Sequence, residues 1–144
     1  MSIRLYPEAF DPWALVQERQ RRQGRDMGAA ATFIGCMRDC NSGDEVTTMT
    51  LEHYPGMTEK VLREIEAEVR ATWDVLDSLI AHRTGEVRPG DPIVLVAVWS
   101  VHRKDAFEAC RALMERLKSD APFWKRETLR DGSTRWVETN TAGY

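Results

Sequence analysis

The sequence is poor in cysteine. It has three, Cys36, Cys40 and Cys110, in a chain of 144 residues. An odd number without a paired framework argues against a disulfide-stabilised secreted protein and favours a reducing compartment. Cys36 and Cys40 are four positions apart, but no second cysteine pair and no spaced histidine pair completes a zinc pattern. We therefore expect neither a disulfide framework nor a metal site.

Long apolar runs and a strong excess of one charge are also missing. The longest apolar run, residues 92–99, is far too short to cross a bilayer, and the amino terminus lacks a charged-then-apolar signal architecture. The formal net charge of −3 offers no global basic field for nucleic acid or a membrane surface. With 42% hydrophobic and 30% charged residues, the chain is expected to form one cytoplasmic globular domain over residues 1–144.

The motifs of several common enzyme classes are absent as well. The sequence contains no glycine-rich phosphate loop, no Gly-x-Ser-x-Gly elbow and no His-Glu-x-x-His metal helix. These absences exclude the usual nucleotide-binding, serine-hydrolase and zinc-protease arrangements. A function has to be sought in residues outside those motifs.

Three segments have helical character. Pro12–Gln23 follows a good N-cap, Asp11, and ends before a glycine. After the Pro-Gly turn at 55–56, apolar residues at 61, 65, 69 and 73 recur every four positions and predict a long amphipathic helix. A third helix is expected to begin at Ser100 as its cap, because positions 106, 110, 113 and 117 are apolar at helical spacing.

Several other segments favour strands. Gly28–Ile34 and Val46–Tyr54 are expected to pair as an antiparallel hairpin with Arg38 at its open end. Leu79–Val87 predicts a strand interrupted by a glycine, and Ile93–Trp99 a central strand covered on both faces.

The C-terminal part favours a hairpin. Residues 124–129 and 134–138 flank an Asp-Gly turn signal, and residues 139–144 are expected to form a loose tail. The order of helices and strands predicts an α+β fold without repeats.

Cationic residues gather at the ends of the predicted elements. They are Arg38, His102–Arg103, Lys118 and Lys125–Arg126. Two lysines on either side of a short Pro-containing loop can converge on one anion, and neighbouring cations lower the pKa of a lysine, which makes an amine available for proton transfer. Such a set suits a small phosphorylated substrate. The alternative is that the lysine-containing segment is only an ordinary helix end followed by a solvated strand, with no ligand.

Two histidine positions have competing interpretations. His102 and Arg103 begin the third helix, where cations oppose the helix dipole, so an anion site and an ordinary exposed turn both remain open. His82 is interpreted as a structural histidine, because no acid or cysteine motif surrounds it.

Five stretches together resemble one known family. They are Phe33-x-Gly-x-x-Arg38, Leu51-Glu-His-Tyr-Pro-Gly-Met57, His82-Arg-x-Gly85, His102-Arg-x-x-Ala-Phe-Glu-Ala109 and Ala121-Pro-Phe-Trp-Lys-Arg-Glu127. In order and with compatible spacing, from about residue 28 to 138, they resemble the large, catalytic subunit of molybdopterin synthase. Cys36, which the family does not require, and the short tail are the departures.

The resemblance implies a fold, partners and a reaction. The fold would be an α/β-hammerhead with additional antiparallel β hairpins. Two large subunits would form a homodimer within a heterotetramer, with a small ubiquitin-like sulfur carrier at each end. The thiocarboxylate on that partner's C-terminal Gly-Gly would donate two sulfurs to cyclic pyranopterin monophosphate and build the molybdopterin dithiolene. This sulfurtransferase chemistry implies no further cofactor.

The resemblance also implies site residues, carried over by position. Lys118 and Lys125 would be catalytic and would contact substrate. The remaining substrate-binding positions would be Cys36, Met37, Arg38, His102, Arg103, Arg126 and Glu127.

Two alternatives follow from these assignments. A module that only docks a ubiquitin-like tail, with cations gripping its carboxylate, is the competing class of function. In addition, a helix from His102 to Lys118 would separate its ends by about 24 Å, too far for one pterin to bridge. We therefore expect a site shared between two copies, with the lysines from one and His102 and Arg103 from the other.

Overall fold

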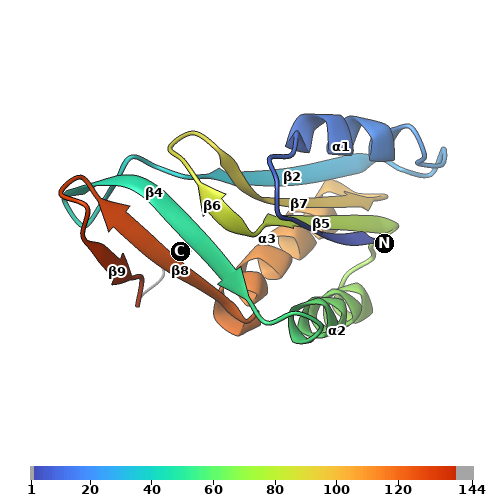
Figure 1. Ribbon diagram of the computed structural model, residues 1–144. Helices are drawn as coiled ribbons and strands as arrows, with labels where there is room; N and C mark the ends of the chain where they lie inside the picture. Colours follow the sequence, from blue (N-terminus) through green and yellow to red (C-terminus); the bar gives the residue numbers. More distant parts are fainter. Residues whose placement is uncertain (1, 139–144) are drawn as a thin grey trace.

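In the computed structural model, which describes residues 2–138, two β-sheets lie next to each other and the helices pack against the first (Figure 1). The elements, in chain order, are β1 (Ser2–Tyr6), α1 (Pro12–Gln20), β2 (Ala29–Cys36), β3 (Cys40–Asn41), β4 (Asp44–His53), α2 (Met57–Thr72), β5 (Asp77–Arg83), β6 (Gly85–Val87), β7 (Pro92–Ser100), α3 (Arg103–Asp120), β8 (Phe123–Leu129) and β9 (Thr134–Trp136). The predicted α+β class is confirmed.

The first sheet has the order β1-β5-β7-β2, with β1 parallel to β5 and the other neighbours antiparallel. Its central strand β7 is buried along nearly its whole length. Val94, Val96 and Val98 face one core, whereas Leu95 and Trp99 face a second core on the other side. The prediction of a strand covered on both faces is confirmed, because a continuous apolar run has no face for water.

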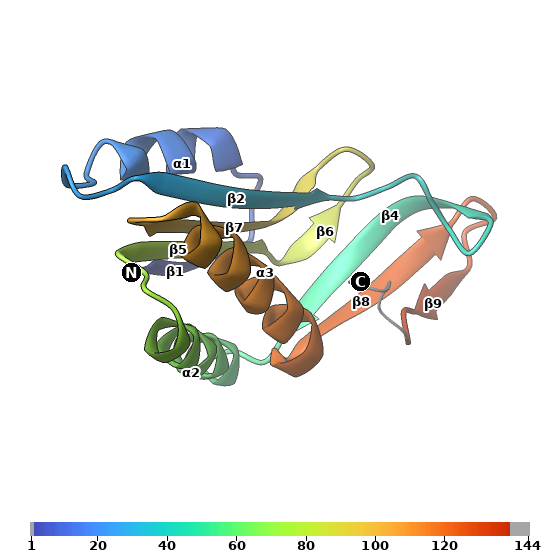
Figure 2. The same ribbon diagram turned by 180° about the vertical axis from the view of Figure 1, so that it is seen from behind.

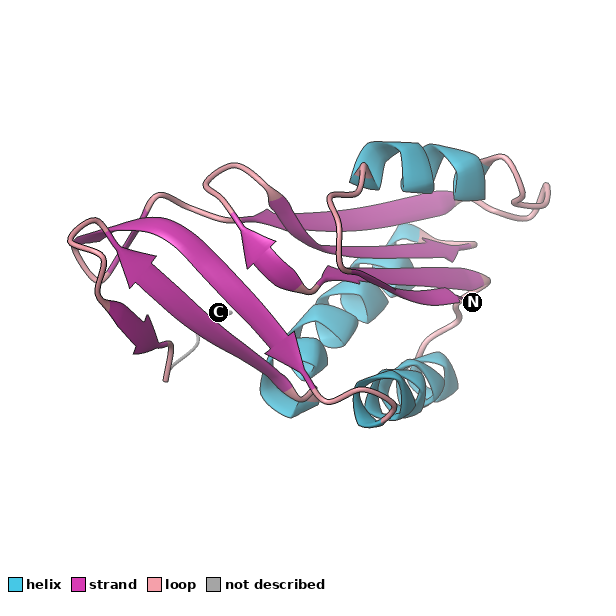
Figure 3. Ribbon diagram, in the orientation of Figure 1, coloured by secondary structure: helices cyan, strands magenta, loops and turns pink. Residues whose placement is uncertain are grey.

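Helices cover both faces of this sheet. Figure 2 shows α2 and α3 on one face and α1 on the other, and Figure 3 separates these helical layers from the strands by colour. The apolar stripe of α2, predicted from its spacing, buries Leu62, Ile65 and Val69 against the sheet. No helix within residues 2–138 is long and apolar enough to cross a membrane.

The second sheet is antiparallel and has β4 near its centre. It has the order β3-β4-β8-β9, and β6 also pairs with β4. The predicted C-terminal hairpin is confirmed as β8 and β9, which pair from Arg126 opposite Trp136 to Thr128 opposite Thr134. Residues 139–144, predicted as a loose tail, lie outside the described part of the chain.

The predicted hairpin of Gly28–Ile34 with Val46–Tyr54 is wrong. β2 pairs with β7 in the first sheet, and β4 pairs with β8 in the second. The chain between them is diverted at Met37, whose backbone accepts from the Gly90 amide and donates to the Asp91 carbonyl. Met37 is also buried in the core, so the connection leaves the first sheet instead of turning back along it.

Some element ends also differ from the predictions. Ser100 is not the cap of α3: it stays buried in β7 and donates to the Asp74 carbonyl at 2.6 Å, while His102 takes the cap position without a side-chain cap bond. The predicted strand 79–87 is two strands, because Gly85 has a φ of 79° and directs β6 into the second sheet. β1 was not predicted, and α1 ends at Gln20 instead of Gln23.

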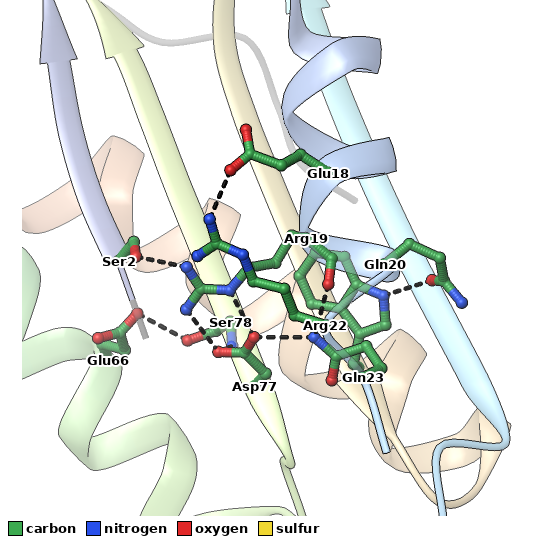
Figure 4. Close-up of polar contacts among 10 residues, drawn as sticks. Ser2, Glu18, Arg19, Gln20, Arg22, Gln23, Glu66, Asp77 and Ser78 are labelled. Atoms are coloured by element: carbon green, nitrogen blue, oxygen red, sulfur yellow. Dashed lines mark hydrogen bonds and ion pairs between the residues drawn. The ribbon is translucent and has the colours of Figure 1, made fainter. Parts of the chain in front are cut away.

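A polar network attaches α1 to the first sheet (Figure 4). The Arg19 guanidinium donates to both carboxylate oxygens of Asp77, at 2.6 and 2.9 Å, and to the Ser2 hydroxyl at 2.6 Å. Gln23 donates to the same carboxylate at 2.9 Å. Burial alone would raise the pKa of Asp77, but the hydrogen bonds from Arg19 and Gln23 lower it well below its ordinary value. The network fixes α1 on the face opposite α2 and α3.

Candidate functional site

Two neighbouring cavities lie where the first sheet, α3 and β8 come together. The first has a volume of about 310 Å³ and the second about 220 Å³. They share Ile93, Val94, Met114, Lys118, Lys125 and Val137 in their linings. Because both predicted catalytic lysines belong to this shared set, a group bound in either cavity reaches the same two side chains.

The two lysines come from different elements. Lys118 lies in the last turn of α3, and Lys125 lies on β8 after the turn at Pro122. Burial lowers the pKa of Lys125 and the positive charge of Lys118 lowers it further, while the nearby Glu127 carboxylate partly opposes both effects. A larger fraction of Lys125 is therefore the neutral amine than for a lysine in water, which suits proton transfer.

One wall of the first cavity follows the end of β2. Cys36, Met37 and Arg38 all line it, as the resemblance implies, and Cys40 and Asn41 continue the wall. Met37 is buried and Arg38 is exposed, so the arginine is the cation that this wall presents to solvent. An exposed guanidinium and two lysine side chains give this cavity lining the positive charge that binding of an anion requires.

Glu127 also lines the first cavity, next to this wall. It is only 3% exposed, and its carboxylate accepts from the Asn41 side-chain amide at 2.7 Å. Arg135 of β9 also lies near it, with 3.9 Å between Nε and Oε1. Asn41 and Arg135 were not predicted as site residues. Neither belongs to a motif, and only the pairing of distant strands brings them here.

The second cavity has an aromatic side. His82 and Phe123 stack with 3.8 Å between their ring centroids, and both line the cavity together with Trp124. Burial lowers the pKa of His82 to about 4, and a contact of 2.7 Å joins its Nδ1 to the Arg83 carbonyl. The ring is therefore neutral at pH 7. The interpretation of His82 as a structural residue fits its burial on β5, but its ring is also part of the cavity lining.

The remaining predicted residues lie away from these cavities. Arg126 is on the opposite face of β8, where its guanidinium carbon lies 5.7 Å from the centre of the Trp136 ring. His102 and Arg103 are exposed at the far end of α3 and line neither cavity. One copy of the chain thus brings together six of the predicted residues: Cys36, Met37, Arg38, Lys118, Lys125 and Glu127.

Cysteine and acidic residues do not build a metal centre in the described part of the chain. Within residues 2–138, no group of three or more His, Cys, Asp or Glu side chains is placed to hold a metal ion. Cys110 is buried on α3, and burial raises the pKa of its thiol to about 11. Of the three thiols, Cys36 and Cys40 face the first cavity.

Comparison of the sequence with known proteins identifies the family. The family described as MoaE protein matches residues 6–120. The molybdopterin synthase catalytic subunit of Ralstonia nicotianae is 54% identical over 138 residues, covering 95% of this chain and 77% of that protein.

Solved structures share the fold as well. The molybdopterin biosynthesis MoaE protein from Burkholderia ambifaria is 46% identical with a TM-score of 0.80, covering 94% of this chain and 88% of that one. Molybdopterin synthase from Staphylococcus aureus is 32% identical with a TM-score of 0.84, covering 94% of this chain and 96% of that one. The resemblance of the five sequence stretches is confirmed, and the chain belongs to the MoaE family.

Proposed function

We propose that this protein is the catalytic subunit of a molybdopterin synthase. It transfers two sulfurs from the C-terminal thiocarboxylate of a small ubiquitin-like partner to cyclic pyranopterin monophosphate, and so forms the molybdopterin dithiolene. The observation that carries this proposal is the position of Lys118 and Lys125 in the lining that two neighbouring cavities share.

Two cavities with a common pair of lysines suit a reaction between two bound groups. The larger one, with Arg38 on its wall, takes the pyranopterin and its phosphate, because an arginine fork binds phosphate oxygens in pairs. The smaller one, with apolar and aromatic sides, takes the extended Gly-Gly end of the partner. The thiocarboxylate then meets the acceptor carbon beside both lysines, where proximity and orientation lower the barrier.

The lysines have separate roles in this transfer. Each transfer replaces a carbon–oxygen bond of the pyranopterin with a carbon–sulfur bond, and the displaced oxygen leaves as water or stays on the phosphate as the cyclic ester opens. The carbon–sulfur bond of the thiocarboxylate breaks, and water supplies the oxygen of the released carboxylate. Lys125, whose pKa is lowered, moves protons during this exchange. Lys118 supplies positive charge to the thiocarboxylate and to the negative oxygen that develops when water attacks it.

The site is completed by a second copy of the chain. His102 and Arg103 cannot reach the lysines of their own copy, because α3 separates them by about 24 Å. Arg103, Phe107 and Lys118 fall on one face of α3, and Phe107 is 67% exposed there. An exposed aromatic residue on that face fits a two-fold interface that delivers the cations of one copy to the cavity of the other.

Reconstitution tests the proposal against the docking alternative. Purified protein is incubated with thiocarboxylated partner and cyclic pyranopterin monophosphate, and the dithiolene product is detected by mass. Lys118→Ala and Lys125→Ala should each lower turnover by about 100-fold or more, the usual scale for an acid–base group, while partner affinity changes little. Lys104→Ala, an exposed lysine on the same helix as Lys118, is the control.

The outcome separates the two classes of function. A docking module would lose affinity for the partner in the two lysine variants and would form no product even as wild type. Near-normal turnover in both variants would show that the catalytic groups lie elsewhere.

A further inference from the structure

Backbone hydrogen bonds hold the start of the first cavity's wall, because Met37 bonds to residues 90 and 91 and the Asp39 carbonyl accepts from the Val46 amide. We call residues 37–44 the wall segment; it contains the cavity-lining residues Met37, Arg38, Cys40 and Asn41. Within it, β3 is two residues long and pairs with β4 across a turn in which Ser42 and Gly43 have φ angles of 53° and 81°. So short a ladder is marginal by itself. Beyond residue 39, the wall segment therefore depends on side-chain contacts in addition to this ladder.

Arg135 of β9 supplies two of those contacts. The guanidinium of Arg135 donates to the Asn41 carbonyl at 2.9 Å and to the Asp44 carboxylate at 2.8 Å. Its Nε also lies 3.9 Å from the Glu127 carboxylate, which itself accepts from the Asn41 amide at 2.7 Å. The donors of the planar Arg135 guanidinium point in fixed directions. They therefore join both strands of the β3–β4 hairpin to β8 and β9 in one defined arrangement.

The same contacts bear on the charge inside the cavity. Glu127 is nearly buried, and a buried carboxylate needs hydrogen-bond and charge partners to remain in place. Lys125 lies two residues before it on the same face of β8, and both side chains line the cavity. With Asn41 and Arg135 holding Glu127 on one side, the carboxylate is kept from swinging fully onto the lysine.

We propose that Arg135 is a positioning residue of the substrate cavity. We call its contacts with Asn41, Asp44 and Glu127 the Arg135 clamp. The clamp holds the wall segment, and with it Arg38, in the geometry that receives the substrate's anionic group. The consequence for substrate rests on the proposed function, whereas the mechanical role of the clamp does not. Arg135 touches no reacting atom in this scheme and acts through Glu127 and the wall segment.

Hydrogen exchange tests the clamp without any substrate. In Arg135→Ala, backbone amides in peptides covering residues 37–46 should exchange at least about tenfold faster than in wild type, since local opening depends on these contacts. Arg130→Ala is the matched control. That arginine lies in the β8–β9 turn and reaches Glu45 of the same β4 strand at 3.2 Å, but it is 80% exposed. Exposed pairs of this kind contribute little, so its exchange should match wild type.

Steady-state kinetics tests what the clamp does for substrate. Arg135→Ala should raise KM for the pyranopterin about tenfold and change kcat by less than about threefold, because binding is lost equally in the ground and transition states. Arg130→Ala should leave both constants unchanged. If Arg135→Ala does not fold, Arg135→Lys replaces it, since lysine keeps the charge but cannot donate along the same directions.

The two readouts fail separately. Unchanged exchange of residues 37–46 in the Arg135 variant, or an unchanged KM, overturns the positioning role. Wild-type protein that forms no product contradicts the proposed function, and the exchange experiment then still decides whether the Arg135 clamp exists.

Discussion

Replacing Arg19 with methionine should destabilise the protein by an amount that the contacts of α1 allow us to estimate. Arg19 makes two short hydrogen bonds to Asp77 and one to Ser2, and the two side chains of the ion pair are 12% and 16% exposed. Removing one partner of a fully buried pair costs about 3–5 kcal/mol. Partial access of water to this pair reduces the expected loss to about 2–3 kcal/mol.

The assay is urea unfolding at pH 7 and constant protein concentration, with a thermal melt beside it. A loss of that size should lower Tm by about 6–9 °C in a chain of this length. Arg22→Met is the matched control on the same helix, because Arg22 pairs with Glu18 only through an exposed contact between positions i and i+4 (Figure 4). Its loss should stay below about 0.5 kcal/mol.

The effect of pH on the Arg19 variant has a definite sign. The folded-state pKa of Asp77 is lowered, so the ion pair contributes stability above the unfolded-state pKa, and that contribution is lost as pH falls through the lower folded-state pKa. The difference between Arg19→Met and wild type should therefore be largest near pH 7 and shrink below about pH 4. A loss no larger than that of Arg22→Met, or a loss independent of pH, would refute this account of the network.

Further predictions concern turnover and one buried acid. If Lys125 is the proton-transfer group, the pH–rate profile of the enzyme should rise with an apparent pKa below the ordinary value of a lysine, and Lys118→Ala should move the rise to higher pH by removing a neighbouring cation. An unmoved profile in that variant contradicts the assignment. Replacing all three cysteines with serine should leave product formation intact in folded protein, since sulfur comes from the partner. Complete inactivity would contradict the partner's thiocarboxylate as the sulfur donor. Mixing inactive Lys118→Ala with inactive His102→Ala subunits should restore partial activity, because one site of a mixed dimer carries neither lesion; no recovery despite proven subunit exchange rules out a shared site. Burial raises the pKa of Glu66 although Ser78 donates to it, so Glu66→Gln should stabilise the fold at pH 7 and gain less toward pH 4, measured by urea unfolding; a gain that does not shrink would be the contrary result.

Local sequence signals predicted the helices and strands whose spacing of apolar residues reflects which of their faces are buried. The apolar stripe of α2 and the continuous apolar run of β7 each correspond to one way of excluding water, so their type followed directly from spacing. The Asp-Gly turn likewise fixed the β8–β9 hairpin, since strands that are close in the chain need only the correct turn.

Strand pairing over long distances could not be predicted in the same way. β4 finds its partner in β8, and β1 finds its partner in β5, across intervening helices and strands. Nothing in the residues of β4 distinguishes β8 from the nearer β2. The choice is made by the burial of Met37 and its backbone bonds to the β6–β7 turn, which are visible only once β7 has been placed.

The site was predictable where it depends on family motifs, but the two faces of β8 were not taken into account. Lys125, Arg126 and Glu127 were assigned to one site because they are consecutive in a recognised motif. Side chains of a strand alternate between its faces, so Lys125 and Glu127 line the first cavity while Arg126 lies against Trp136 on the other face. A motif that is continuous in sequence therefore serves two surfaces.

The placement of Arg126 also restricts how it can contribute to the reaction. Arg126 lies on the face of β8 that points away from the first cavity, which we call the outer face. For it to reach the lysines of its own copy, β8 would have to slip by one residue along β4, with which it pairs from Leu129 to Phe123. Such a slip would turn Glu127 out to solvent and break its bond with Asn41. A contact of Arg126 with another molecule would therefore be made from the outer face, where the exposed Trp136 beside it supplies apolar area. Lys125 and Glu127 line the first cavity from the other face of β8, and the register of the strand keeps them apart from Arg126.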